Sequence, residues 1–164
     1  MERKRHMRIG QGFDAHRFGG DEGRELWLAG LRWEGGYGIE GDSDGDVAAH
    51  ALIDALLSAS GLGDIGSMFG VGADAHGAGM HGAAMLEETV ARLRAHGFAP
   101  ESASVAIVGN RPKIGPRREE AAEALSCAVG CRVSVTATTT DGMGFTGCDE
   151  GVAAVANALV RESV

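Results

Sequence analysis

Aromatic side chains are scarce in this chain of 164 residues, at 5% of the composition, whereas glycine occurs 27 times. Small residues and tight turns should therefore shape the fold. The hydrophobic fraction of 44% is ordinary for a soluble globular chain and argues against disorder. At this length we expect one domain, residues 1–164, with a core of its own.

Positive charge is also in short supply, because 15 Lys and Arg stand against 23 Asp and Glu and leave a net charge of −8. This balance argues against a nucleic-acid groove and against binding to an anionic membrane surface. An anionic substrate would have to be neutralised locally, by a metal, by backbone N–H groups or by single basic residues.

Long apolar runs are missing, so we expect no membrane-spanning segment. The start, "MERKRHM", is basic but is followed by no apolar stretch, which disfavours a secretory signal, and either Met1 or Met7 could begin the chain. The three cysteines contain no C-x-x-C pair, as is typical of a reducing cytoplasm. Cys127 and Cys131, four residues apart, are expected to be small buried residues.

Extended and helical patterns alternate along the chain. Between them, residues 72–82 are rich in Gly, Ala and His and are predicted to form a loop. The alternation predicts an α/β fold, a two-layer α+β sandwich with one mostly mixed β-sheet covered by helices. Strands are expected at 7–18, 26–35, 102–109 and 132–140, and helices at 46–62, 83–98, 116–130 and 150–162.

The stretch "GDSDGDVAAH", residues 41–50, resembles a calcium loop at first sight. Acids and a glycine fall at the required early positions when counting starts at Glu40, but position 12 is then Ala51 and not the bidentate Glu that completes such a site. We therefore reject calcium. Asp44 or Asp46 could instead cap the helix that follows.

A second interpretation of this stretch involves a metal. Asp14 and His16 lie two apart on a predicted strand and so share one face. His50, one turn into the helix, could complete a set of two imidazoles and one carboxylate, which is how catalytic zinc is commonly held. From spacing alone, an ordinary hydrogen-bonded histidine remains the alternative.

Two junctions between strand and helix could contact phosphate. "TATTTDGMGFTG", residues 136–147, ends a strand with hydroxyl groups and enters a glycine-rich turn, and "NRPKIGPRRE", residues 110–119, places Lys113 after Pro112. Such junctions present backbone N–H groups to anions. Ordinary polar turns are the alternative for both.

The order of these segments is more informative than any one of them. "GFDAHRF", "SDGDVAAHALIDALLSASGLGDIGSMF", "RPKIGP", "TTTDGMGFTG" and "DEGVAA" follow one another along the chain. Together they closely resemble the 2-C-methyl-D-erythritol 2,4-cyclodiphosphate synthase family of the non-mevalonate isoprenoid pathway. The resemblance extends from about Arg8 to Val160.

The resemblance implies a cytoplasmic homotrimer with active sites between subunits. It also implies a phosphorus–oxygen lyase that cyclises 4-diphosphocytidyl-2-C-methyl-D-erythritol 2-phosphate to 2-C-methyl-D-erythritol 2,4-cyclodiphosphate and releases CMP. Asp14, His16 and His50 would hold zinc, and a second cation, Mg or Mn, would accompany the diphosphate.

The remaining site residues are likewise implied by matching positions. Asp64 and Gly66 would hold the cytidine ribose, and Ser43 and Asp46 would lie in the loop that closes on the substrate. The implied catalytic set is Ser43, Asp46, Lys113, Thr139 and Asp141; the implied substrate-binding set is Asp42, Asp64, Gly66, Phe69, Pro112, Lys113, Ile114, Ala137, Thr138, Thr139, Phe145 and Cys148.

Four positions depart from the family pattern. Asp42 replaces a histidine, Cys148 an arginine and Val71 an aspartate, and Asp141 stands where a glutamate is usual. His76, His81 or Arg111 could compensate. The alternative is a divergent member, a trimeric metal- and diphosphate-binding protein that keeps the metal and nucleotide residues but has an altered substrate or no turnover.

Overall fold

The computed structural model describes residues 6–162. The first five residues of the basic start, Met1 among them, lie outside the described part. The elements in chain order are β1 (Met7–Arg17), β2 (Leu26–Leu28), β3 (Leu31–Trp33), α1 (Val47–Ser60), α2 (Ile65–Phe69), α3 (Gly82–Ala95), β4 (Phe98–Val108), the 3-10 turn η1 (Gly115–Arg117), α4 (Arg118–Val129), β5 (Arg132–Thr138), α5 (Gly144–Gly147) and β6 (Gly151–Glu162).

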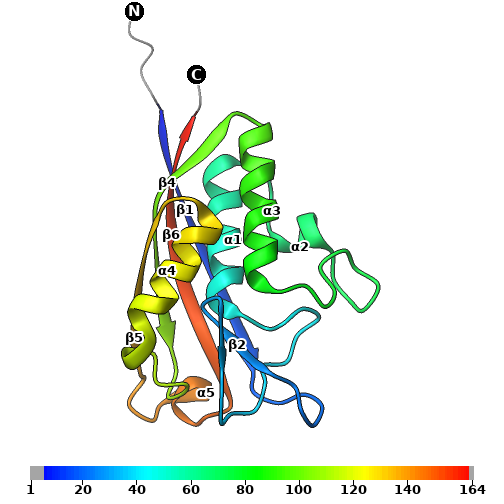
Figure 1. The fold of residues 1–164 in the computed structure, drawn as a ribbon, viewed down its shortest axis with the longest axis vertical. Helices are drawn as coiled ribbons and strands as arrows, with labels where there is room; N and C mark the ends of the chain where they lie inside the picture. The colour runs from blue at the N-terminus through cyan, green and yellow to red at the C-terminus, as the bar shows by residue number, and fades with distance from the viewer. Residues whose placement is uncertain (1–5, 163–164) are drawn as a thin grey trace, which may run out of the picture.

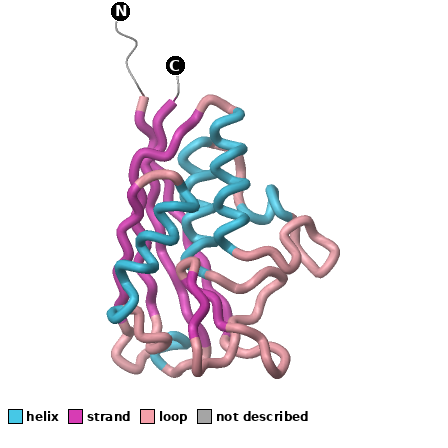
Figure 2. Tube along the Cα trace, viewed as in Figure 1, coloured by secondary structure: helices cyan, strands magenta, loops and turns pink. Residues whose placement is uncertain are grey.

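Four strands form the main sheet in the order β1-β6-β4-β5, and β2 and β3 form a separate hairpin. Strand β6 is antiparallel to both of its neighbours, while β4 and β5 are parallel, so the sheet is mixed. Helices α1, α3 and α4 cover one face of the sheet (Figures 1 and 2). The predicted fold class, one mixed sheet covered by helices, is confirmed.

The direction of the strands decides where a site can form. Because β6 runs against both β1 and β4, the strands β1, β4 and β5 all point the same way. Their carboxyl ends therefore meet at one end of the sheet, together with the start of β6 and with α5, at the bottom of Figure 1. All of the segments quoted from the sequence for phosphate or metal binding lie at or near this end.

The prediction of a helix at residues 150–162 is wrong, because this segment is strand β6. Its alanine-rich composition favours a helix by intrinsic propensity. The burial pattern, however, has the period of two that is typical of a strand. The residues at most 2% exposed, which face the helices, are Val152, Ala154, Ala156, Ala158 and Val160. Hydrogen bonding to β1 on one side and β4 on the other then fixes the extended form.

Helix α1 lies against the backbone of β1. A Cβ added to Gly12 would be 1.9 Å from the carbonyl oxygen of Ala51, and one added to Gly10 would be 2.1 Å from that of Ala55. Only glycine permits this approach. Asp46 caps the helix through the N–H groups of Ala48 and Ala49, and Gly61 ends it in the left-handed conformation at φ 72°.

Three smaller features differ from the sequence predictions. The extended stretch at 26–35 is a hairpin in itself, β2 and β3, rather than one strand that pairs with a later segment. The short helix α2 was not predicted. Cys127 is exposed and Cys131 half-buried, so the expectation that both are buried is wrong.

The face of the sheet opposite the helices is covered by no element among residues 6–162. Ile9 is 76% exposed and Phe13 59% exposed on this face. The register places Ile9 beside Leu159 and Phe13 beside Val155, so the exposed apolar groups form rows across the strands.

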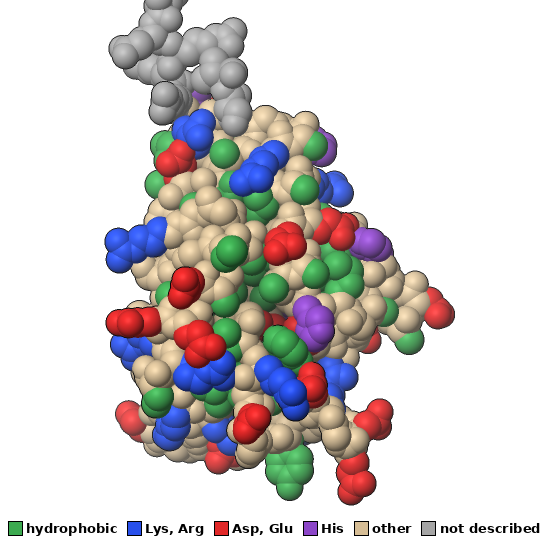
Figure 3. All heavy atoms as spheres, viewed as in Figure 1, with side chains coloured by type: hydrophobic (Ala, Val, Ile, Leu, Met, Phe, Trp, Pro, Cys, Tyr) green, Lys and Arg blue, Asp and Glu red, His purple; other side chains and the backbone are tan. Residues whose placement is uncertain are grey.

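Figure 3, which views the molecule as in Figure 1, shows acidic and basic side chains intermixed over its lower half.

Candidate metal and substrate site

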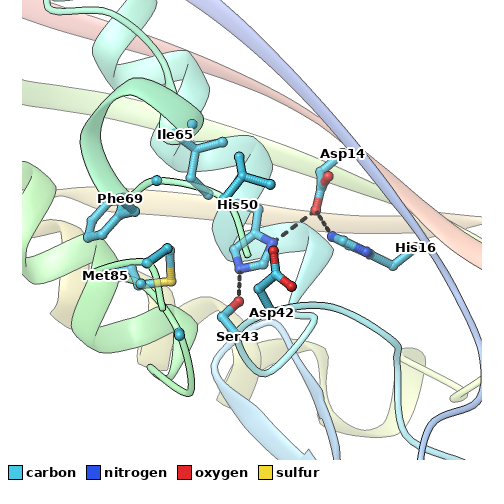
Figure 4. Close-up of a pocket in the computed structure, with 14 residues that line it drawn as sticks. Asp14, His16, Asp42, Ser43, His50, Ile65, Phe69 and Met85 are labelled. Carbon is cyan, nitrogen blue, oxygen red and sulfur yellow. Dashed lines mark hydrogen bonds and ion pairs between the residues drawn. The ribbon is translucent and has the colours of Figure 1, made fainter. Parts of the chain in front are cut away.

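Three side chains predicted as metal ligands converge at the edge strand. Asp14 and His16 project from β1, and His50 projects from the first turn of α1 toward them (Figure 4). One ligand atom from each residue lies within 4.8 Å of the others. The predicted group of two imidazoles and one carboxylate is thus assembled by the fold.

Both imidazoles face the same carboxylate oxygen. His50 Nδ1 lies 3.0 Å and His16 Nε2 lies 3.1 Å from Asp14 Oδ2. The second ring nitrogen of His50, Nε2, lies 3.0 Å from Ser43 Oγ. Two nitrogens and one oxygen within 4.8 Å of one another, with Ser43 beside the second nitrogen of one ring, suit a divalent cation such as zinc.

The charges of the group are coupled. Burial by itself raises the pKa of the Asp14 carboxyl, but hydrogen bonds from His16 and His50, together with their charge, outweigh it and lower the pKa from 3.8 to about 2. Burial lowers the pKa of the His50 imidazole, but its contact with Asp14 raises that pKa above the ordinary value. Asp14 is therefore ionised throughout the physiological range, as a metal ligand must be.

A cavity of about 210 Å³ opens beside the triad. Its far wall is apolar and is supplied by α2, by the loop at 70–78 and by α3, which contribute Ile65, Phe69 and Met85 (Figure 4). Of the implied substrate residues, Asp42, Gly66 and Phe69 line this cavity, and Ser43 does so too. The sequence reasoning missed Ile65 and Met85, whose helical spacing marks them only as ordinary core residues.

Asp42 also anchors the loop that forms this wall. Its carboxylate accepts a hydrogen bond from Gly72 N at 2.8 Å, and its backbone carbonyl accepts one from Gly79 N at 2.8 Å. Val71, directly before the anchor at Gly72, lines the cavity but is 84% exposed. His76, in the same loop, stacks on Phe69 and pairs with Glu88 at 2.8 Å.

Asp46, implied to act on the substrate, does not line the cavity. Its carboxylate is fully buried and accepts hydrogen bonds from the N–H groups of Ala29 and Gly30, in the β2–β3 turn, as well as from the first turn of α1. Burial, followed by the nearby charge of Asp44, raises its pKa. The contacts of Asp46 fix the position of α1, and hence of His50.

A second cavity, of about 260 Å³, lies at the opposite edge of the sheet. It is formed where β4 and β5 end, and the implied nucleotide residues come together there: Pro112, Lys113, Ile114, Ala137, Thr138 and Thr139. Arg111 and Arg118 line it as well. Arg118 was not predicted, although it follows the Pro112–Lys113 pair by only a few residues.

The other implied residues line neither of these two cavities. Asp64 caps α2 through Ser67 N at 2.7 Å, and this hydrogen bond lowers its pKa. Asp141 sits in a turn at φ 51°, with its carboxylate 3.4 Å from the hydroxyl of Thr139. Phe145, 43% exposed, borders a further cavity of about 210 Å³ that His16 also lines, and Cys148 is exposed.

Comparison with known proteins agrees with this geometry. The profile of the YgbB family matches residues 7–161, and the chain belongs to this family. Over 166 residues it is 70% identical to the 2-C-methyl-D-erythritol 2,4-cyclodiphosphate synthase of Bifidobacterium longum (strain NCC 2705), covering 94% of this chain and 95% of that protein.

Solved structures show the same fold. A 2C-methyl-D-erythritol-2,4-cyclodiphosphate synthase in a CDP-bound form is 38% identical, with a TM-score of 0.81 and coverage of 93% of this chain and 99% of that one. The bifunctional IspDF of Campylobacter jejuni is 31% identical, with a TM-score of 0.88 over 97% of this chain and 43% of that larger chain. Within residues 6–162, no helix is long and apolar enough to cross a membrane.

Proposed function

We propose that the protein is a metal-dependent cyclodiphosphate synthase, a phosphorus–oxygen lyase formed as one domain. It would convert 4-diphosphocytidyl-2-C-methyl-D-erythritol 2-phosphate to 2-C-methyl-D-erythritol 2,4-cyclodiphosphate and CMP. The observation that carries this proposal is the convergence of Asp14, His16 and His50 beside a cavity of about 210 Å³. The 70% identity to a synthase of this name supports it.

In the reaction the substrate's 2-phosphate oxygen attacks the β-phosphorus, and the bond from that phosphorus to the CMP oxygen breaks. The polypeptide need not supply a nucleophile; it must hold the two phosphates in line and balance their charge. Asp14, His16 and His50 would hold zinc, and Asp141 would help to hold Mg or Mn. Bound cations supply charge neutralisation and Lewis acidity.

The side chains divide the remaining work. Ser43 orients His50, while Asp42 fixes the loop that forms part of the cavity wall. Lys113 and the hydroxyls of Thr138 and Thr139, in the second cavity, would bind the nucleotide and its phosphates. The acidic net charge would be no obstacle, because the carboxylates of the site would hold cations, whose charge would offset that of the phosphates.

The two cavities explain why we propose a homotrimer with active sites between subunits. Strand β1 and strand β5 are at opposite edges of a four-stranded sheet, so within one chain these two strands lie roughly 14 Å apart. A small substrate that uses both cavities would require the metal edge of one subunit to meet the nucleotide edge of another. The uncovered sheet face with Ile9 and Phe13 provides a surface through which subunits could associate.

The direct test is to incubate the protein with zinc, magnesium and the substrate and to follow CMP and the cyclic diphosphate by phosphorus NMR. We expect both products in equal amounts, and their loss when the metal is chelated. The alternative, a divergent diphosphate-binding member, is favoured by Asp42, Val71 and Cys148. Binding of CDP without any CMP above the no-enzyme control would establish that alternative and refute the synthase.

A further inference from the structure

Arg24 lies outside both cavities, in the loop between β1 and β2, yet it contacts the segment that leads into the metal site. Its Nε donates to the carbonyl oxygen of Ile39 at 2.6 Å, and its Nη2 donates to those of Gly41 and Ser43 at 3.2 and 2.5 Å. Three carbonyls spaced two residues apart thus converge on one guanidinium.

Arg24 holds a segment that has little regular pairing of its own. Ile39 forms an isolated bridge with Phe18, and residues 41–43 form a bend. The carbonyls of Ile39, Gly41 and Ser43 accept their hydrogen bonds from Arg24. The guanidinium is planar and has five fixed N–H donors, so it can serve several acceptors at once in a defined geometry.

The aliphatic part of the Arg24 side chain is also closely packed. A Cβ added to Gly38 would be 2.6 Å from Arg24 Cγ, and one added to Gly20 would be 2.6 Å from Arg24 Cδ. The side chain is half-buried between these two glycines. Because its aliphatic part is packed and its guanidinium makes three hydrogen bonds, the Arg24 side chain has little freedom to move. It therefore restrains the backbone that it contacts.

The contacted backbone includes Ser43 and flanks Asp42, and both of these residues line the first cavity. The Ser43 side chain lies 3.0 Å from His50 Nε2, which leaves Nδ1 as the nitrogen that faces Asp14. The Asp42 side chain, between the carbonyls of Gly41 and Ser43, holds the loop at Gly72. Hydrogen-bond partners of a ligating histidine fix its ring orientation and tautomer.

We propose that Arg24 is a positioning residue of the metal site, which holds residues 39–43 so that Ser43 presents His50 to the metal through Nδ1. Arg24 acts through Ser43 and touches neither metal nor substrate. The inference rests on the proposed function only in assuming that Asp14, His16 and His50 bind a divalent cation.

The test measures zinc binding to the metal-free full-length protein by calorimetry, independently of turnover. We expect Arg24→Ala and Ser43→Ala each to weaken zinc binding about tenfold or more, as loss of a partner of a metal ligand commonly does. Arg24→Lys should fall between wild type and Arg24→Ala, because an ammonium cannot serve three carbonyls in one plane.

The double variant separates positioning from a general loss of stability. If Arg24 acts through Ser43, Arg24→Ala combined with Ser43→Ala should bind zinc no more weakly than Ser43→Ala alone. Additive losses would overturn the proposal. Melting temperatures recorded without metal show whether each variant remains folded under the assay conditions.

Arg117 provides a matched control. It too is a half-buried arginine that donates to a backbone carbonyl, that of Arg32 at 2.7 Å, but it lies on η1, away from residues 39–43. Arg117→Ala should lower the melting temperature and leave zinc affinity unchanged. Equal zinc affinity in Arg24→Ala and wild type would refute the role of Arg24, whereas absence of zinc binding by the wild type would refute the proposed function itself.

Discussion

The two edges of the main sheet are built on different principles. At the β1 edge, the metal group is made of ionisable side chains held by one another: Asp14 by both imidazoles, and His50 by Asp14 and Ser43. At the β5 edge, the second cavity consists of loop backbone, hydroxyl groups and basic side chains around Lys113. The side chains at the β1 edge are therefore held in place by their own charge pairs. Those at the β5 edge have polar and basic groups that a charged ligand would bring together.

This difference predicts the largest effect at the metal edge. His50→Ala should abolish stoichiometric zinc and lower turnover by about a thousandfold or more, since a catalytic metal contributes several kcal/mol to the transition state. Zinc content by atomic absorption and CMP release measure the two effects. His96→Ala, at the exposed end of α3, is the control and should retain zinc; full zinc retention in His50→Ala would show that the ligand assignment is wrong.

A smaller effect is expected at the nucleotide edge. Lys113→Ala should weaken CDP binding about 10- to 100-fold, the equivalent of one charge-assisted hydrogen bond of about 1.5–3 kcal/mol. Zinc content should stay at the wild-type level, because Lys113 lies in the other cavity. Lys113→Arg, which keeps the charge, should recover part of the affinity. Loss of zinc in Lys113→Ala would mean that the two edges are not independent.

The third effect concerns the stability of the metal-free protein and its dependence on pH. The lowered pKa of Asp14 adds stability above pH 3.8 that is lost as the pH falls toward 2, and the raised pKa of His50 adds stability below pH 6.5 that is lost as the pH rises through that raised value. The pair should therefore stabilise the fold most between these limits, by about 2 kcal/mol.

Urea unfolding of zinc-free wild type and Asp14→Asn over this range measures the contribution. The difference in unfolding free energy should be largest between pH 4 and 6.5 and should shrink on either side. A constant difference across the range would show that the pair does not couple folding to protonation.

The sequence predicted the proximity of Asp14, His16 and His50, because they lie in local patterns: two residues on one strand and one residue in the first turn of a capped helix. It could not predict that the implied nucleotide residues gather at the far edge, since that depends on the strand order. The strand order in turn depends on β6, where alanine-rich composition suggested a helix and pairing on both sides imposed a strand.

Two further features were beyond local patterns for a similar reason. The apolar wall of the first cavity comes from α2 and from α3, whose residues look like any core positions until the chain brings them beside His50. Arg24 acts on backbone carbonyls, and these have no residue-type signature at all. Contacts made to the main chain are visible only once the fold is known.

The glycines of β1 have a consequence for the tolerance of the metal site to change. Gly10 and Gly12 let α1 rest on the strand that bears Asp14, so the separation of helix and strand is the same separation that a cation must bridge between His50 and Asp14. A methyl group at Gly12 would push α1 away from β1 and increase the distance between His50 and Asp14. Two glycines that lie outside the group of Asp14, His16 and His50 thus set how closely the helix brings His50 to Asp14.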